Sequence, residues 1–229
     1  MTPLLYIIIL AIIGIFSATI TVLWRNDKNP LSGLISKSII NFVIIYLAIM
    51  SFALNEGSSA LFEGLILLGL VAGLLGDIFF CYIGTDKAKQ IEKVVFSAKI
   101  VSYFMFLIAI VHITTVTWLY GFILGIIFTI LAVFSDKIFK IETIKYKWVF
   151  PVYAIILGTI FGQCIFQIIL ESFSLVNLLA LIGFAVLLTA DILWLYNLFG
   201  GKKFKNLQIV SSILHYLSQI IIASLIFFV

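Results

Sequence analysis

The chain has 229 residues, of which 64% are hydrophobic and only 10% are charged, and its formal net charge is +4 at pH 7. Soluble domains are about half apolar, so this composition excludes an ordinary soluble protein. The basic residues lie between apolar segments of membrane-spanning length, so membrane topology explains the positive charge and no nucleic-acid partner is implied.

Eight apolar segments follow one another along the chain, and a helix needs about 20 apolar residues to cross a bilayer. The predicted spans are 4–24, 33–54, 61–82, 94–115, 118–135, 148–170, 175–198 and 207–228. These spans and their short connections use nearly the whole sequence. We therefore expect an all-α membrane protein, an eight-transmembrane-helix bundle that forms one integral membrane domain over residues 1–229. Function must then reside within the bundle.

The first predicted span ends at an arginine. The apolar stretch from Leu4 to Trp24 has no basic residue before it and Arg25 directly after it. A cleavable signal peptide has its basic residues before the apolar stretch. We therefore expect a retained span whose N-terminus lies outside the cytoplasm.

Basic residues occur in alternate connections. The first, third, fifth and seventh connections contain Lys or Arg, beginning with Arg25 and Lys28. The even-numbered connections contain none, only acids such as Glu56 and Glu171. Because Lys and Arg are kept on the cytoplasmic side, both termini are predicted to lie outside the cytoplasm. The chain is expected to be a multi-pass membrane protein, of the inner membrane if its source is prokaryotic.

The third predicted span carries Gly69, Gly73 and Gly76 at near-helical spacing. Small residues let helices approach closely, so this span is predicted to pack tightly on a neighbour. Its end, GLVAGLLGDIFF, is similar to GFAVLLTADILW in the seventh span, and KIVSYFMF in the fourth span is similar to QIVSSILH in the eighth. A parallel duplication of two four-helix halves would explain both similarities.

Ionisable side chains inside the predicted spans are the most informative feature of the sequence. On insertion scales such a group costs about 2.5–3.5 kcal/mol at the centre of a helix, so it needs a partner, a cavity or a function. The depth of each group follows from its distance to the nearest basic connection, at about 1.5 Å per helical residue. Four groups then lie at a similar depth in the cytoplasmic half: Lys37, Asp77, Asp191 and His215. This convergence predicts a cavity open to the cytoplasmic side.

The remaining polar groups in the spans lie at other depths or are neutral. Lys99 is somewhat shallower than the four groups above, and His112 lies near the outer end of its span. Gln163, Gln167 and Gln219 are neutral companions of the ionisable groups.

A purely structural role for these side chains is the simplest alternative. Asp77 and Asp191 could form ion pairs with Lys37 and Lys99. His215, with Gln219 one turn deeper, could hold helices together through hydrogen bonds.

At these positions the sequence resembles the YhhN family, the lysoplasmalogenase-like membrane proteins. LLGDIFF, which contains Asp77, resembles the family's Gly-Asp motif. GFAVLLTADILWLYNLF resembles its Ser-Asp segment, with Ala190 in place of the usual Ser before Asp191. LHYLSQIIIASL resembles its Tyr-Tyr-x-x-Gln segment and supplies Tyr216 and Gln219, with His215 in place of the first Tyr.

Three further positions extend the resemblance over most of the chain. ISKSII keeps Lys37 of a Lys-Pro motif but has Ser38 for the Pro. AIVHITT keeps His112 of a His-x-x-Tyr motif but has Thr115 for the Tyr, and Tyr153 falls where the family tends to have a Tyr in its sixth span. The departures at Ser38, Thr115 and Ala190 weaken the prediction of the exact substrate more than the prediction of family membership.

The resemblance implies hydrolysis of the vinyl ether bond of alkenyl lysophospholipids, which gives a fatty aldehyde and a glycerophospho-alcohol. This chemistry begins with protonation of the β-carbon, which creates an oxocarbenium ion that water captures. Such a cation calls for a proton donor and a nearby carboxylate, as in glycoside hydrolysis. Asp77 and Asp191 are the expected catalytic pair. The expected positioning or substrate-binding residues are Lys37, His112, Tyr153, His215, Tyr216 and Gln219.

Three other functions fit these residues less well than a hydrolase does. A proton-coupled transporter also uses intramembrane Asp, Lys and His, but the spans lack the paired Gly or Pro interruptions of broken transport helices. Two histidines at different depths are too few for a zinc-dependent hydrolase, and Cys81 and Cys164 have no metal-site spacing. No metal or other cofactor is therefore expected. A structural scaffold would not explain buried acids at matched depth.

Overall fold

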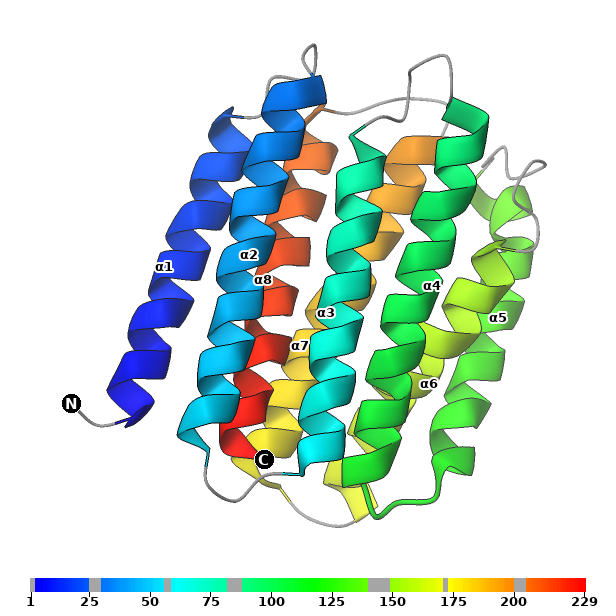
Figure 1. The fold of residues 1–229 in the computed structure, drawn as a ribbon. Coiled ribbons are helices and arrows are strands. Elements are labelled where there is room, and N and C mark those ends of the chain that lie inside the picture. Colours follow the sequence, from blue (N-terminus) through cyan, green and yellow to red (C-terminus); the bar gives the residue numbers. More distant parts are fainter. Residues whose placement is uncertain are drawn as a thin grey trace. The chain divides into compact units, whose positions relative to one another are not determined.

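A computed structural model describes residues 3–24, 30–55, 59–81, 88–139, 149–170, 173–199 and 205–229. Within these residues all regular structure is helical (Figure 1). The helices are α1 (Pro3–Trp24), α2 (Pro30–Leu54), α3 (Ala60–Phe80), α4 (Ala88–Ile113), α5 (Trp118–Phe139), α6 (Val149–Leu170), α7 (Leu175–Phe199) and α8 (Lys205–Phe228). Each predicted span corresponds to one helix. The largest differences are at α4, which begins at Ala88 rather than 94, and at α5, which continues to Phe139 rather than ending at 135.

The helices have the length and composition of membrane spans. Seven contain a stretch long and apolar enough to cross a bilayer, and α5 contains the shorter apolar stretch Trp118–Phe134. Many large apolar side chains face outward, among them Phe16 and Phe42 with 67% and 62% of their surface exposed. Lipid chains would cover such surfaces. The predicted eight-helix, multi-pass membrane protein is therefore confirmed.

The connections that carry most of the basic residues, including Arg25 and Lys28, lie outside the described residues. The predicted orientation, with both termini outside the cytoplasm, therefore stays a prediction.

The three prolines of the chain fit the starts of helices. Pro3 and Pro30 are the first residues of α1 and α2, and Pro151 lies in the first turn of α6. Proline is tolerated there because the first N–H groups of a helix have no intrahelical acceptor. The spans consequently run without proline in their interiors.

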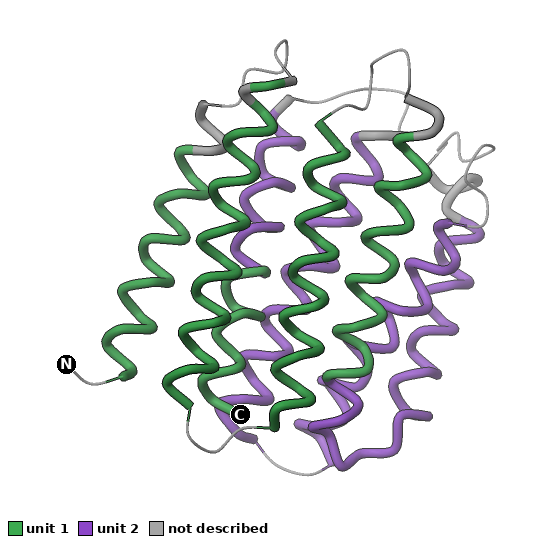
Figure 2. The backbone as a smooth tube through the Cα atoms, in the orientation of Figure 1, with its two compact units in different colours: residues 1–109, 219–229 green, residues 110–218 purple. Residues whose placement is uncertain are grey.

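The helices divide into two compact units (Figure 2). Unit 1 comprises residues 1–109 and 219–229, and unit 2 comprises residues 110–218. Unit 1 thus contains α1, α2, α3, most of α4 and the end of α8. Unit 2 contains α5, α6, α7 and the first part of α8.

In unit 1, glycines on α3 allow α4 to approach closely. A Cβ atom on Gly69 would clash with the ring of Phe106, and one on Gly76 would lie 3.2 Å from Cγ of Lys99. A Cβ on Gly73 would lie 3.4 Å from the hydroxyl oxygen of Ser102. The predicted tight packing of this glycine-bearing span is confirmed.

In unit 2, α5 and α6 interlock through two pairs of glycines four residues apart. Gly121 and Gly125 lie on α5, and Gly158 and Gly162 lie on α6. A Cβ on Gly158 would lie 3.0 Å from Cα of Gly125, and a Cβ on Gly162 would lie 3.0 Å from Cα of Gly121. This helix pair makes the most extensive contact in the described part of the chain. Such a small-x-x-x-small pattern brings backbones together in membranes.

The turn between α4 and α5 is held by two glutamines of α6. The side-chain amide of Gln163 donates to the hydroxyl of Thr114 at 2.9 Å and to the carbonyl oxygen of Val116 at 2.7 Å. The backbone N–H of Val116 donates to the side-chain oxygen of Gln167 at 3.4 Å. Backbone groups outside a helix need such partners at membrane depth. Gln163 and Gln167 are therefore turn-stabilising residues.

Candidate functional site

Asp77 lies in the last turn of α3 and is only 5% exposed. One oxygen of its carboxyl group accepts a hydrogen bond from the side-chain amide of Asn41 on α2 at 3.2 Å. The other lies 3.8 Å from Nζ of Lys99 on α4. The same amide nitrogen of Asn41 also donates to the backbone oxygen of Lys37 at 2.8 Å. The carboxyl is thus positioned from both neighbouring helices.

Lys37 joins this arrangement from α2. Its ammonium nitrogen lies 4.2 Å from the centre of the Phe80 ring, a distance suited to a cation–π interaction. Phe80 is the last residue of α3, where the helix dipole also favours a cation. We call Lys37, Asn41, Asp77 and Lys99 the unit 1 polar cluster. Each of the four side chains is more than nine-tenths buried.

The unit 1 polar cluster agrees in part with the structural alternative raised by the sequence, since Asp77 and Lys99 do form an ion pair. The sequence analysis did not select Asn41. Its one signal is its position four residues after Lys37, which places both side chains on the same face of a helix.

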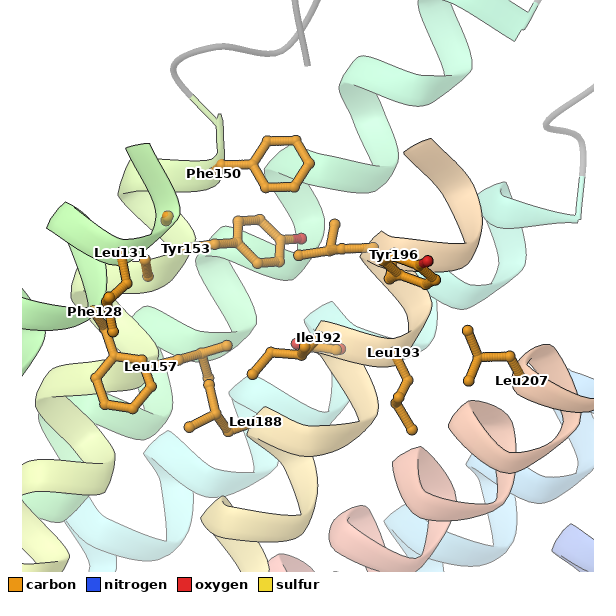
Figure 3. A pocket seen from close by; sticks show the side chains of 14 residues that line it. Phe128, Leu131, Phe150, Tyr153, Leu157, Leu188, Ile192, Leu193, Tyr196 and Leu207 are labelled. Carbon is orange, nitrogen blue, oxygen red and sulfur yellow. The ribbon is translucent and has the colours of Figure 1, made fainter. Parts of the chain in front are cut away.

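Asp191 lines a cavity of about 560 Å³ that lies entirely within unit 2 (Figure 3). The cavity is lined by Phe128, Leu131 and Ala132 of α5, Phe150, Tyr153, Ala154 and Leu157 of α6, Leu188, Asp191, Ile192, Leu193, Leu195 and Tyr196 of α7, and Leu207 of α8. Asp191 is 2% exposed and is the one ionisable carboxyl group in this lining.

Two tyrosines supply the other polar groups of the cavity. Tyr153 extends from α6 and Tyr196 from α7, and both lie among apolar side chains (Figure 3). Tyr153 is among the residues selected from the sequence, whereas Tyr196 is not. On α7, Leu188, Ile192 and Tyr196 follow one another at intervals of four residues and so share one face of the helix.

The residue before Asp191 is linked to α8 by a hydrogen bond. Ala190 is fully buried, and its backbone oxygen accepts a hydrogen bond from the hydroxyl of Ser211 at 3.0 Å. The hydroxyl group of Ser211 on α8 therefore lies next to Ala190 of α7.

The other predicted positioning residues lie outside the cavity lining. The rings of His215 and Tyr216 on α8 are 5.5 Å apart in an edge-to-face arrangement, and Tyr216 is 3% exposed. Gln219, also 3% exposed, is the first residue of the part of α8 that belongs to unit 1. His112 lies in the last turn of α4, within unit 2.

The structure reveals a buried acid that the sequence analysis overlooked. Glu63 is 1% exposed, and neither of its carboxyl oxygens has a hydrogen-bond partner among the described residues. It lies in the first turn of α3, where the helix dipole favours a negative charge. Glu63 and Asp77 are fourteen residues apart in the sequence, which corresponds to about 21 Å along a helix. Glu63 is therefore outside the candidate site.

The chemistry of the candidate residues rests on carboxyl, hydroxyl and ammonium groups. Among the described residues, no group of three His, Cys, Asp or Glu side chains is placed to hold a metal ion.

Of the comparisons with known proteins, only the comparison with protein families gives a match. No curated protein sequence and no solved structure matches the chain. The model of the YhhN family matches residues 34–226, which is most of the chain. The match includes Asp77, Asp191 and every predicted positioning residue. This eight-helix membrane protein belongs to the YhhN family.

Proposed function

We propose that the protein hydrolyses the vinyl ether bond of alkenyl lysophospholipids, releasing a fatty aldehyde and a glycerophospho-alcohol. Membership of the YhhN family is consistent with this lysoplasmalogenase-like activity. The observation that carries the proposal is the position of Asp191, a buried carboxyl group in the lining of an otherwise largely apolar cavity.

The cavity suits the hydrocarbon chain of such a substrate. Its volume of about 560 Å³ falls within the roughly 300–1,000 Å³ typical of ligand pockets. Apart from Asp191 and the hydroxyls of Tyr153 and Tyr196, its lining side chains are apolar. An alkenyl chain in this cavity would place its double bond within reach of a single acid. We assign Asp191 as the proton donor.

The reaction consumes one water and needs no other reactant. Asp191 transfers its proton to the β-carbon of the vinyl ether, and the positive charge that forms is shared by the α-carbon and the ether oxygen. Water adds to the α-carbon and loses a proton, which restores the acid. The resulting hemiacetal then breaks its bond to the glycerol oxygen, and the proton of its hydroxyl group passes to that oxygen, giving the aldehyde and the alcohol.

Asp77 is the proposed second carboxyl group of this reaction. It has a cation 3.8 Å from one oxygen and an amide donor on the other, so it is held as a fixed carboxylate. Such a group stabilises an oxocarbenium ion. Tyr153 is the proposed positioning residue of the cavity. The resemblance assigns Lys37, His112, His215, Tyr216 and Gln219 to positioning or substrate binding.

The test is aldehyde release by purified protein in detergent, with alkenyl and acyl lysophospholipids compared. Wild-type protein should release aldehyde from the alkenyl lipid only. Asp77→Asn and Asp191→Asn should each lower the rate at least about 100-fold, the usual effect of losing a positioned acid or base.

Glu63→Gln is the matched control for these variants. It removes another buried acid of α3 that lies outside the candidate site, and the rate should stay near that of wild type. A folded Asp191→Asn variant with full activity, or wild-type protein that releases no aldehyde, would refute the proposed function.

A further inference from the structure

The polar groups of the unit 2 cavity lie at two levels. On α7, which ends at Phe199, Tyr196 is three residues and Asp191 eight residues before that end. Tyr153 lies four residues after Val149, where α6 begins at the same end of unit 2 (Figure 1). At about 1.5 Å per helical residue, the two tyrosines lie about 5–6 Å from this end, and Asp191 lies about 12 Å from it.

The cavity becomes apolar beyond the level of Asp191. In Figure 3 the rings of Tyr153 and Tyr196 lie on the side of the cavity nearest Phe150, whereas Leu157 and Leu188 lie on the opposite side. A lipid would therefore place the end of its hydrocarbon chain near the leucines. Its polar part would lie at the level of the tyrosines.

The level of the tyrosines suits an uncharged polar group. No lysine, arginine or histidine is among the described residues of the lining, and Phe150, Leu195 and Leu207 add only apolar surface near this end. A buried phosphate would need a positive charge beside it. A hydroxyl group needs only hydrogen bonds.

A tyrosine hydroxyl can supply such hydrogen bonds. It has one O–H donor and also accepts hydrogen bonds. It can therefore bind the hydroxyl group of a ligand while it keeps a contact with the protein. Tyr153 and Tyr196 supply two such groups from neighbouring helices that line the same cavity.

The separation of the two levels matches the proposed substrate. In an alkenyl lysophospholipid the middle glycerol carbon carries an unesterified hydroxyl group, a few bonds from the β-carbon that receives the proton. The tyrosines and Asp191 are separated by about 6–8 Å along the helix axes. A few covalent bonds of about 1.5 Å each and a hydrogen bond of about 2.8 Å cover this separation.

We propose that Tyr196, together with Tyr153, binds the unesterified hydroxyl group on the middle glycerol carbon of the lipid. This contact holds the reacting double bond at the level of Asp191. The identification of the ligand as an alkenyl lysophospholipid rests on the proposed function. Tyr196 is thus a specificity-determining residue, because a lipid without this hydroxyl group cannot donate the hydrogen bond.

The test measures binding and therefore does not depend on turnover. Purified protein in nanodiscs of phosphatidylcholine, which has no unesterified glycerol hydroxyl, is titrated with two uncleavable ligands. These are 1-O-alkylglycero-3-phosphocholine and its 2-deoxy analogue, which share one saturated chain and one headgroup. Wild-type protein should bind the ligand with the hydroxyl group about tenfold more tightly, the effect of a buried hydrogen bond. Equal affinity for the two ligands would overturn the proposal.

Substitutions that remove only a hydroxyl group assign the contact to residues. Tyr196→Phe and Tyr153→Phe should each remove most of the preference for the hydroxyl ligand while keeping the affinity for the 2-deoxy ligand. A role in folding alone would change both affinities together and leave their ratio unchanged. A folded variant at either position that keeps the full preference would therefore overturn the proposal.

Tyr120→Phe is the matched control for these variants. Tyr120 lies on α5 of the same unit, is 44% exposed, and is outside the cavity lining. Its removal of a tyrosine hydroxyl should leave the preference at the wild-type value. A loss equal to that in Tyr196→Phe would contradict recognition within the cavity.

Two outcomes distinguish this proposal from the hydrolase. A preference for the hydroxyl ligand that depends on Tyr196, without aldehyde release from the alkenyl lipid, would end the proposed hydrolysis and support the hydroxyl contact. Aldehyde release together with equal affinity for the two uncleavable ligands would overturn the hydroxyl contact and leave the hydrolase.

Discussion

Asp77 and Asp191 are both buried, but they lie in different surroundings. Asp77 is held between an amide of α2 and an ammonium group of α4, whereas Asp191 lines an apolar cavity of unit 2. Carboxyl groups in unlike environments readily take unlike roles in acid catalysis. The proposed division, with Asp191 as donor and Asp77 as fixed carboxylate, follows from these surroundings.

A residue of the cavity wall should set the preferred chain length. Ala154 lines the cavity next to Tyr153, so Ala154→Phe would fill part of the space for the alkenyl chain. Activity on long-chain substrates should fall about tenfold or more relative to short-chain ones, the usual scale of discrimination by an apolar pocket. The measurement is aldehyde release over a series of chain lengths.

Val152→Phe is the control for this variant. Val152 lies on the same helix, is 40% exposed, and is outside the cavity lining. Its chain-length profile should match that of wild type. Identical profiles for Ala154→Phe and Val152→Phe would mean that the cavity does not hold the chain.

Asp77, Asp191 and Lys37 could be selected as candidates from the sequence because charged groups stand out in apolar spans. It could not predict Asn41, whose neutral amide has a smaller insertion cost and whose role depends on a hydrogen bond between α2 and α3. Glu63 was not selected from the sequence although it is an acid within a span, because it lies near the start of that span and not at the level of the other groups.

At the level of helices, the interlocked α5 and α6 support one wall of the cavity. Phe128 of α5 and Leu157 of α6 line the cavity, and both adjoin the contact made by Gly158. A Cβ on Gly158 would lie 2.9 Å from Cβ of Phe128 and 3.0 Å from Cα of Gly125. The backbones would have to separate to admit a methyl group.

Gly158→Ala should therefore destabilise the protein by about 1–3 kcal/mol, the usual cost of overpacking. Gly64→Ala is the control, because a Cβ there would meet nothing within 4 Å. That variant should be neutral, or stabilised by up to about 1 kcal/mol through helix propensity. The measurement is thermal unfolding in detergent. Equal effects of the two substitutions would contradict the close packing of α5 and α6.

The same helix pair shows the limit of sequence reasoning about elements. The predicted fourth and fifth spans meet between residues 115 and 118, and the structure has its break there, between Ile113 and Trp118. The partners of that break, Gln163 and Gln167, come from α6 about fifty residues later. Such contacts depend on which helices are neighbours, and hydropathy carries no information on that.

For the whole molecule, the number and positions of the helices could be predicted because the bilayer imposes a length on each span. All eight predicted spans correspond to helices. The division into two compact units lies near the middle of the chain, where the sequence similarity suggested two halves, although the end of α8 belongs to unit 1. Such a division depends on which helices pack together. The apolar sequences of the spans are too similar to one another to predict that packing.

The central claim is the proposal that Asp77 and Asp191 serve a single reaction, and a double-mutant cycle tests it most directly. Aldehyde release is measured for wild type, Asp77→Asn, Asp191→Asn and the double variant. Groups that act together lose little more when both are removed, so the double variant should be within a few-fold of the slower single variant. Independent losses that multiply to about 10,000-fold would contradict the claim.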